Sequence, residues 1–164
     1  MNVNYKPGLE PRKQASNSLR KNYAFLIFVL ILLLNCSGTK PILIGQFPPC
    51  PDKPNCVSSK SSLSLHKIAP LTYNGNSKDA REKLLGIINS MPRTQISMEN
   101  ENFIHVEFTS KIFRFVDDVE FYFKSPGTIH FRSASRVGHS DMGVNRDRME
   151  EIRSLFIQAF QGTE

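Results

Sequence analysis

The sequence predicts an α+β fold, with two helices packed on one face of a four- to five-stranded, mostly antiparallel sheet. Apolar residues recur at helical spacing in two segments, 78–91 and 146–161. Between these segments, apolar and polar residues alternate as they do in strands with one buried face. Single-turn connections at 98–103 and 125–128 force the strands that they join to run antiparallel.

Regular structure is expected to begin with a short alternating run at 63–68, followed by a turn at TYNGNS. Ser77 is placed to cap the first helix, because a hydroxyl can accept a hydrogen bond from the first helical turn. This helix ends before Pro92, and its apolar face consists of Ala80, Leu84, Ile87, Ile88 and Met91.

Four strands are expected next, at 95–98, 103–108, 119–124 and 129–133. The turn ENEN separates the first pair of strands, and Ser125-Pro126-Gly127 separates the last pair. The final helix has one apolar stripe, and Gly162 marks its end. The stripe consists of Met149, Ile152, Leu155, Phe156, Ala159 and Phe160.

Residues 1–35 differ in character from the rest of the chain. Five basic residues and one acidic residue in the first 22 positions precede the run AFLIFVLILLL. These eleven residues are too short to cross a hydrocarbon core of about 30 Å as a helix. The layout is that of an export signal, so we expect 1–35 to be a signal peptide. An uncleaved N-terminal anchor is the alternative.

The end of this segment, Leu33-Leu34-Asn35-Cys36, resembles the lipobox of bacterial lipoproteins. The resemblance implies cleavage before Cys36 and acylation of its thiol, so that the domain is held outside the cytoplasm by a membrane lipid. Because Ser37 rather than aspartate follows the cysteine, the outer membrane is favoured over the inner one. Residues 36–62 then form a lipid-anchored tether with a disulfide loop, and 63–164 form a single globular domain.

The positive charge of the chain lies mostly in the expected signal. The formal net charge is +6, but residues 1–35 hold five basic residues and one acidic residue, which leaves about +2 for 36–164. Nucleic-acid binding needs a concentrated basic surface. We therefore expect no nucleic-acid partner.

Cys50 and Cys56 lie close together in PPCPDKPNCVSS. Outside the cytoplasm such a pair is typical of a disulfide that closes a small loop. A zinc site would need a second pair of ligands, which the sequence lacks at suitable spacing. Two free thiols are the remaining alternative.

The segment SASRVGHSDMGVNRDR, residues 133–148, is the most polar candidate for a functional site. Gly138 and Gly143 bracket a short loop, and Asn145 is placed to cap the last helix. Free N–H groups at a helix start with arginines nearby favour an anion or another polar ligand. The candidate ligand-binding residues are Arg136, His139, Ser140, Asp141, Asn145 and Arg146.

A structural reading of the same segment competes with the ligand site. Arg136 can pair with Asp117 or Asp118, while Asp141 and Asn145 can accept hydrogen bonds from backbone N–H groups in the turn. We expect 136–148 to be chiefly a structural clasp, with anion binding as a second use.

Catalysis is the weaker hypothesis. A hydrolase would use a site around Asp117, Asp118, Arg136 and His139, but successive residues of a regular strand face opposite sides. No G-x-S-x-G or H-E-x-x-H motif is present, and the four histidines are scattered in the sequence. We expect neither a cofactor nor a metal site.

Three stretches together, SASRVGHSDMGVNRDRMEEIR, PPCPDKPNCVSS and FTSKIFRFVDDVEFYF, resemble the bacterial and chloroplast family called domain of unknown function 1499. The resemblance runs from about Phe47 to Phe160. It implies one coherent fold and no particular activity, because the biochemical role of the family is not established. The expected function is therefore an envelope lipoprotein whose domain is a non-catalytic binding or structural module for a polar or anionic ligand or an envelope protein.

Overall fold

The computed structural model describes residues 45–161 together with Met1, Tyr23 and Ile27. The chain divides into two compact units, Met1–Asn35 and Cys36–Glu164. The second unit contains the sheet, both of its helices and the buried core, so it has what it needs to fold on its own. The rest of the expected signal peptide, the expected lipid site Cys36, the expected tether up to residue 44 and Gly162 lie outside the described residues.

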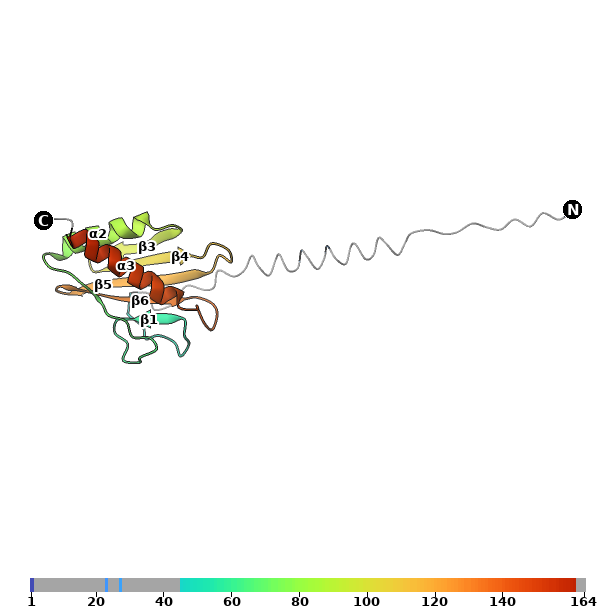
Figure 1. Cartoon of the computed structure of the whole chain (residues 1–164), viewed down its shortest axis with the longest axis horizontal. Helices are drawn as coiled ribbons and strands as arrows, with labels where there is room; N and C mark the ends of the chain where they lie inside the picture. The colour runs from blue at the N-terminus through green and yellow to red at the C-terminus, as the bar shows by residue number, and fades with distance from the viewer. Residues whose placement is uncertain (2–22, 24–26, 28–44, 162–164) are drawn as a thin grey trace. The chain divides into compact units, whose positions relative to one another are not determined.

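Six antiparallel strands form one sheet in the described part of the chain (Figure 1). The sheet order is β1-β6-β5-β4-β3, and β2 also pairs with β6. This confirms the α+β class, although the sheet has six strands rather than four or five. The strands are β1 Cys56–Ser58, β2 Leu71–Thr72, β3 Thr94–Asn100, β4 Phe103–Thr109, β5 Val116–Ser125 and β6 Thr128–Ser135.

The expected strand at 63–68 is wrong. This segment is a turn, and its pairing with the sheet is an isolated bridge between Ser58 and Lys67. Leu63 and Leu65 are exposed, while His66 is buried and its Nδ1 lies 3.0 Å from the carbonyl oxygen of Cys56. The first strand lies instead at β1, within the segment expected to be a tether.

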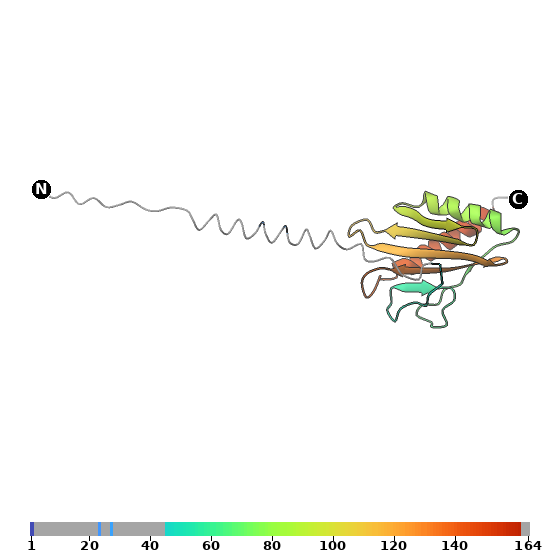
Figure 2. The same cartoon turned by 180° about the vertical axis from the view of Figure 1, so that it is seen from behind.

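Both predicted helices are present, as α2 Ser77–Ser90 and α3 Val144–Gln161. Asn76 caps α2 in place of Ser77, because its Oδ1 accepts the N–H of Asp79 at 2.8 Å. The two helices lie side by side on one face of the sheet, which Figure 2 shows from behind. They bury its main core, which includes Leu84, Ile88, Val106, Phe121, Phe131, Met149, Ile152 and Phe156.

The other face of the sheet is also covered at its centre. Every residue from Val116 to Phe123 is buried, so the alternate residues of β5 that point away from the helices are buried too. The segment that begins at Gly45 contributes to this cover. The N–H of Gly45 donates to Glu120 Oε1 at 3.1 Å, and the N–H of Phe47 donates to the Tyr122 hydroxyl at 3.0 Å. Polar side chains are therefore held away from water on both faces.

Candidate functional site

Arg136 follows directly after β6 and forms a double hydrogen bond to Asp118. Its Nε lies 2.8 Å from Oδ2 of Asp118, and one terminal nitrogen lies 2.7 Å from Oδ1. The same arginine pairs with Glu107 at 2.9 Å, and Asp118 is fully buried. This confirms the expected pairing of Arg136 with one of the two aspartates. The planar guanidinium matches both oxygens of a carboxylate, so the pair fixes the start of the loop against β4 and β5.

Asp118 also contacts His105, which in turn contacts Ser97. His105 Nε2 lies 2.7 Å from Asp118 Oδ1, and Nδ1 lies 2.6 Å from the hydroxyl of Ser97. Burial alone would raise the pKa of the Asp118 carboxyl, but hydrogen bonds from Arg136 and His105 outweigh burial and hold this pKa below its ordinary value. The hydrogen bond to Asp118 raises the pKa of Arg136, so the pair stays ionised.

Asp117 faces the helices, on the opposite side of β5 from Asp118. Its Oδ2 accepts a hydrogen bond from Arg148 of α3 at 2.6 Å, and the Arg148 guanidinium lies 4.7 Å from the centre of the Phe108 ring. The alternation of side chains along a regular strand predicted that the two aspartates face opposite sides, and they do. They are therefore not paired carboxylates. Each one anchors a different arginine.

The start of α3 is capped by Asp141, not by Asn145 as expected. Asp141 accepts the N–H of Gly143 at 3.0 Å and that of Asn145 at 2.8 Å. Gly138 and Gly143 both adopt positive φ, at 90° and 89°, which a residue with a Cβ rarely does. The helix begins at Val144, so Asn145 already lies within it.

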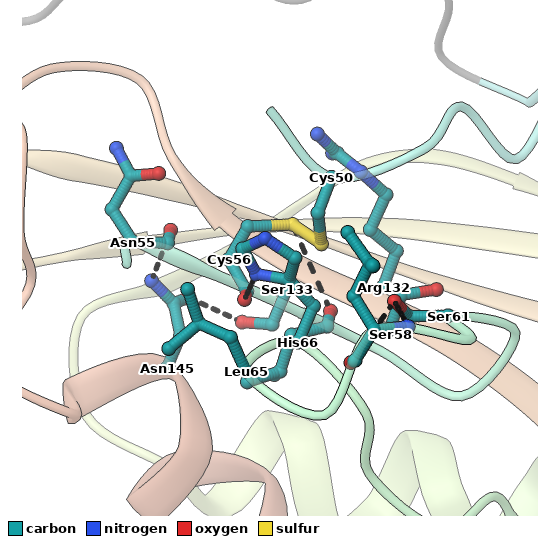
Figure 3. The surroundings of a disulfide bond; sticks show 12 residues. Cys50, Asn55, Cys56, Ser58, Ser61, Leu65, His66, Arg132, Ser133 and Asn145 are labelled. Carbon is teal, nitrogen blue, oxygen red and sulfur yellow. Dashed lines mark hydrogen bonds between the residues drawn. A yellow bond between two sulfur atoms is a disulfide. The ribbon is translucent and has the colours of Figure 1, made fainter. Parts of the chain in front are cut away.

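Asn145 is instead the buried centre of the loop (Figure 3). Its Nδ2 donates to Ser135 Oγ at 3.0 Å, to Asp141 Oδ2 at 2.8 Å and to the carbonyl oxygen of Asn55 at 3.3 Å. Its Oδ1 accepts from the hydroxyl of Ser133 and from Arg148, the latter at 2.9 Å. One amide thus joins β6, α3 and the segment before β1.

The anion-site hypothesis assumed that the Arg146 side chain extends freely from the helix, but this side chain binds another part of the domain. Its two terminal nitrogens donate to the carbonyl oxygens of Lys67 and Leu65, each at 3.0 Å. The side chain therefore holds the 63–67 turn against the start of α3.

His139 and Ser140 are exposed in the middle of the loop. The Ser140 hydroxyl accepts the N–H of Met142 at 3.2 Å. Among the contacts of the described residues, none joins His139 to Asp117, Asp118 or Arg136. Of the four residues considered for a hydrolase, the fold therefore pairs Arg136 with Asp118 but does not bring Asp117 or His139 to this pair.

A cleft of about 470 Å³ lies beside the disulfide that joins Cys50 to Cys56. The disulfide was expected from the sequence, whereas the cleft was not. Its walls are the segment 46–50 on one side and parts of the turn after β1 on the other, and Figure 3 shows Ser58, Ser61 and His66 near the disulfide. The lining residues outside 46–50 are Ser58, Lys60, Ser61, Ser62, Leu63 and His66.

Lys60 supplies positive charge at this cleft. Its Nζ lies 5.1 Å from the centre of the Phe47 ring. Burial, and then the charge of Lys60, lower the pKa of His130, which contacts the hydroxyl of Ser59 at 3.1 Å. The cleft therefore combines one cation and several hydroxyl groups with an apolar wall of Phe47, Pro48 and Pro49.

The family model described as "Protein of unknown function (DUF1499)" matches residues 46–156. The chain belongs to the DUF1499 family. No curated protein and no solved structure matches the chain. The DUF1499 domain starts ahead of residue 63, where the globular domain was expected to begin, and so includes the disulfide, β1 and the cleft.

Within the DUF1499 domain, sequence reasoning missed Ser97, His105 and Lys60. The first two come together only through the pairing of β3, β4 and β5, and the serines around Lys60 resembled a tether. In the described part of the chain, no cluster of three or more His, Cys, Asp or Glu side chains is arranged to hold a metal ion. None of the helices described there has both the length and the apolar character needed to cross a membrane.

Proposed function

We propose that this chain is a lipid-anchored protein of the cell envelope whose DUF1499 domain binds a small ligand without catalysing a reaction. The basic, apolar and cysteine-containing order of the first 36 residues supports the anchor at Cys36 and a domain outside the cytoplasm, at the outer membrane rather than the inner one. The disulfide is consistent with this, because such bonds persist in oxidising compartments.

In this proposal, the 136–148 loop stabilises the fold and does not bind the ligand. Arg136, Arg146 and Arg148 each donate to a carboxylate or to backbone carbonyls of the domain itself. An anion that approached them would have to displace these partners. The clasp therefore shapes the domain, and the ligand is assigned to the cleft beside the disulfide.

The cleft itself is the observation that supports ligand binding most directly. The Lys60 ammonium and the hydroxyls of Ser58 and Ser61 favour an anionic or strongly polar group. The Phe47 ring and the two prolines beside it favour a flat apolar group. The ligand class is thus a small molecule with an anionic end and a flat apolar part.

Phenyl phosphate is a suitable probe for this chemistry, with phenol as its uncharged counterpart. We expect phenyl phosphate to raise the melting temperature of the Cys36–Glu164 unit more than phenol does, because it alone places an anion near Lys60. Lys60→Ala should weaken phenyl phosphate binding about tenfold while leaving the unliganded melting temperature nearly unchanged.

Lys124→Ala is the matched control, since Lys124 is an exposed lysine of β5 that does not line the cleft. Equal weakening in both lysine variants would show a nonspecific charge effect and refute the cleft. A phenyl phosphate shift that Lys60→Ala leaves intact would refute it as well.

A second candidate function, acyl hydrolysis, rests on the chain of contacts from Ser97 through His105 to Asp118. If Asp118 accepts the Nε2 proton, Nδ1 of His105 is free to accept the proton of the Ser97 hydroxyl, as a triad requires. Two observations favour a structural role instead: Arg136 already neutralises Asp118, and His105 is only 1% exposed.

A fluorophosphonate probe distinguishes the two candidates, because it labels activated serines. The binding-module proposal expects no labelling of the Cys36–Glu164 unit. Labelling that disappears in Ser97→Ala, while Ser140→Ala still labels, would replace the binding module by a hydrolase.

A further inference from the structure

Exposed apolar side chains gather on two loops of the domain. Ile112 is 79% exposed and Phe113 59% exposed, on the connection between β4 and β5. Met142 is 94% exposed and Val144 48% exposed, where the chain leaves β6 and enters α3. Soluble surfaces rarely group large apolar side chains in this way without a partner.

The two loops lie at the same end of the sheet. Thr109 pairs with Val116 across β4 and β5, and Asp117 pairs with Ser135 across β5 and β6. The end of β4, the start of β5 and the end of β6 are therefore neighbours. Figures 1 and 2 show both connections leaving the sheet at that end.

The β4–β5 connection, residues 110–115, is held so that its tip projects away from the sheet. The N–H of Ser110 donates to the carbonyl oxygen of Phe115 at 2.8 Å, and the N–H of Phe115 donates back to the Ser110 hydroxyl at 2.9 Å. The Phe113 and Phe115 rings stack with their centres 5.5 Å apart. These contacts close the connection at its base, so Ile112 and Phe113 stay exposed instead of folding back onto the sheet.

The connection is also cationic. Lys111 and Arg114 flank the two apolar residues, and residues 109–116 contain no acidic residue. Arg93 lies beside its base, because its Nε donates to the carbonyl oxygen of Thr109 at 3.1 Å. Asp147 in the first turn of α3 offsets part of the positive charge near the second loop. Residues 110–115 therefore carry most of the positive charge that attracts anions.

We propose that this end of the domain docks on the surface of an anionic lipid bilayer. Ile112, Phe113 and Met142 enter the boundary between headgroups and acyl chains, while Lys111 and Arg114 contact the headgroups. Apolar side chains beside cations at a loop tip match the layered chemistry of that boundary. The docking is independent of the ligand cleft, and of a lipid at Cys36.

The test uses the Cys36–Glu164 unit with Cys36→Ser, so that no acyl chain contributes to binding. The chain has no tryptophan, so Phe113→Trp introduces a single tryptophan as the fluorescent reporter. On vesicles of phosphatidylcholine with phosphatidylglycerol, we expect its emission to shift to the blue and to be quenched by lipids brominated on their acyl chains. Ile157→Trp, at an exposed apolar position of α3, should show neither effect.

Affinity for the same vesicles separates apolar from ionic contributions. The double variant Ile112→Ser/Phe113→Ser should bind about tenfold more weakly, because less apolar surface leaves water. Lys111→Glu should lower affinity at least about fivefold on anionic vesicles and should have little effect on pure phosphatidylcholine. The matched control, Met98→Ser/Ile157→Ser, removes two exposed apolar side chains that lie on β3 and α3 and should bind like the parent.

Melting temperatures of all variants should stay close to that of the parent, because the replaced side chains are exposed. No binding by the parent, or equal binding by the tip and control variants, would overturn the proposal. Concentration-dependent dimerisation of the parent that the tip variant abolishes, without vesicle binding, would assign this end to a second copy of the chain and would also overturn it.

Discussion

Replacing Arg136 by alanine is expected to lower the free energy of unfolding by about 3–5 kcal/mol. The variant would leave the fully buried Asp118 with His105 as its remaining side-chain partner and would also remove the contact to Glu107. Urea unfolding at pH 7 measures the loss directly. Arg81→Ala is the control, because the pair of Arg81 with Glu99 is partly exposed and should contribute about 1 kcal/mol or less.

The same pair should produce an acid-sensitive component of stability. The folded-state pKa of Asp118 lies below its unfolded value, which is about 3.9. The contribution of the ionised carboxyl is therefore complete above about pH 4 and is lost as pH falls through the lower, folded-state pKa. Because Arg136→Ala removes the main group that lowers this pKa, that variant should lose less stability over the same acid range. A variant as stable as the parent at pH 7, with an unchanged acid profile, would contradict the role of Arg136.

Replacing Asn145 by alanine is expected to lower the free energy of unfolding by about 2–4 kcal/mol. The amide is fully buried, and its loss would leave the Asn55 carbonyl and the Ser133 hydroxyl without one of their partners. Asn145→Leu separates hydrogen bonding from packing, since leucine keeps most of the volume but none of the donors. Both variants should be destabilised in urea, whereas Val144→Ala, at an exposed neighbour, should unfold like the parent. If Asn145→Leu were as stable as the parent, packing alone would explain the contribution of this position to stability, and its hydrogen bonds would be unnecessary.

The helices and the long strands could be predicted because each one has a continuous apolar pattern. Leu84 and Ile88 recur at helical spacing, while Val119 and Phe121 alternate as in a strand, and all four lie in the core. The strands β1 and β2 have three and two residues, which is too short for any period to show. Apolar and polar residues do alternate at 63–68, but hydrogen bonds to Arg146 and to the Cys56 carbonyl hold that segment as a turn.

The candidate site was predicted in part. A polar turn with an arginine and nearby aspartates was enough to predict the Arg136 pair, and two cysteines in a short loop were enough to predict the disulfide. His105 and Ser97 could not be placed, because only the strand register brings them to Asp118. The burial of Asn145 and the partners of Arg146 depend on segments far away in the sequence, at Asn55 and Leu65.

The central claim, that Arg136 and Asp118 hold the 136–148 loop as a structural clasp, is tested most directly by a double-mutant cycle between these two residues. Urea unfolding of Arg136→Ala, Asp118→Ala and the double variant gives the energy of their coupling. The account predicts a coupling of about 2–3 kcal/mol, because each single variant leaves the other buried charge without its partner. Single losses that add to within about 0.5 kcal/mol would contradict it, because two residues that stabilise each other cannot act independently.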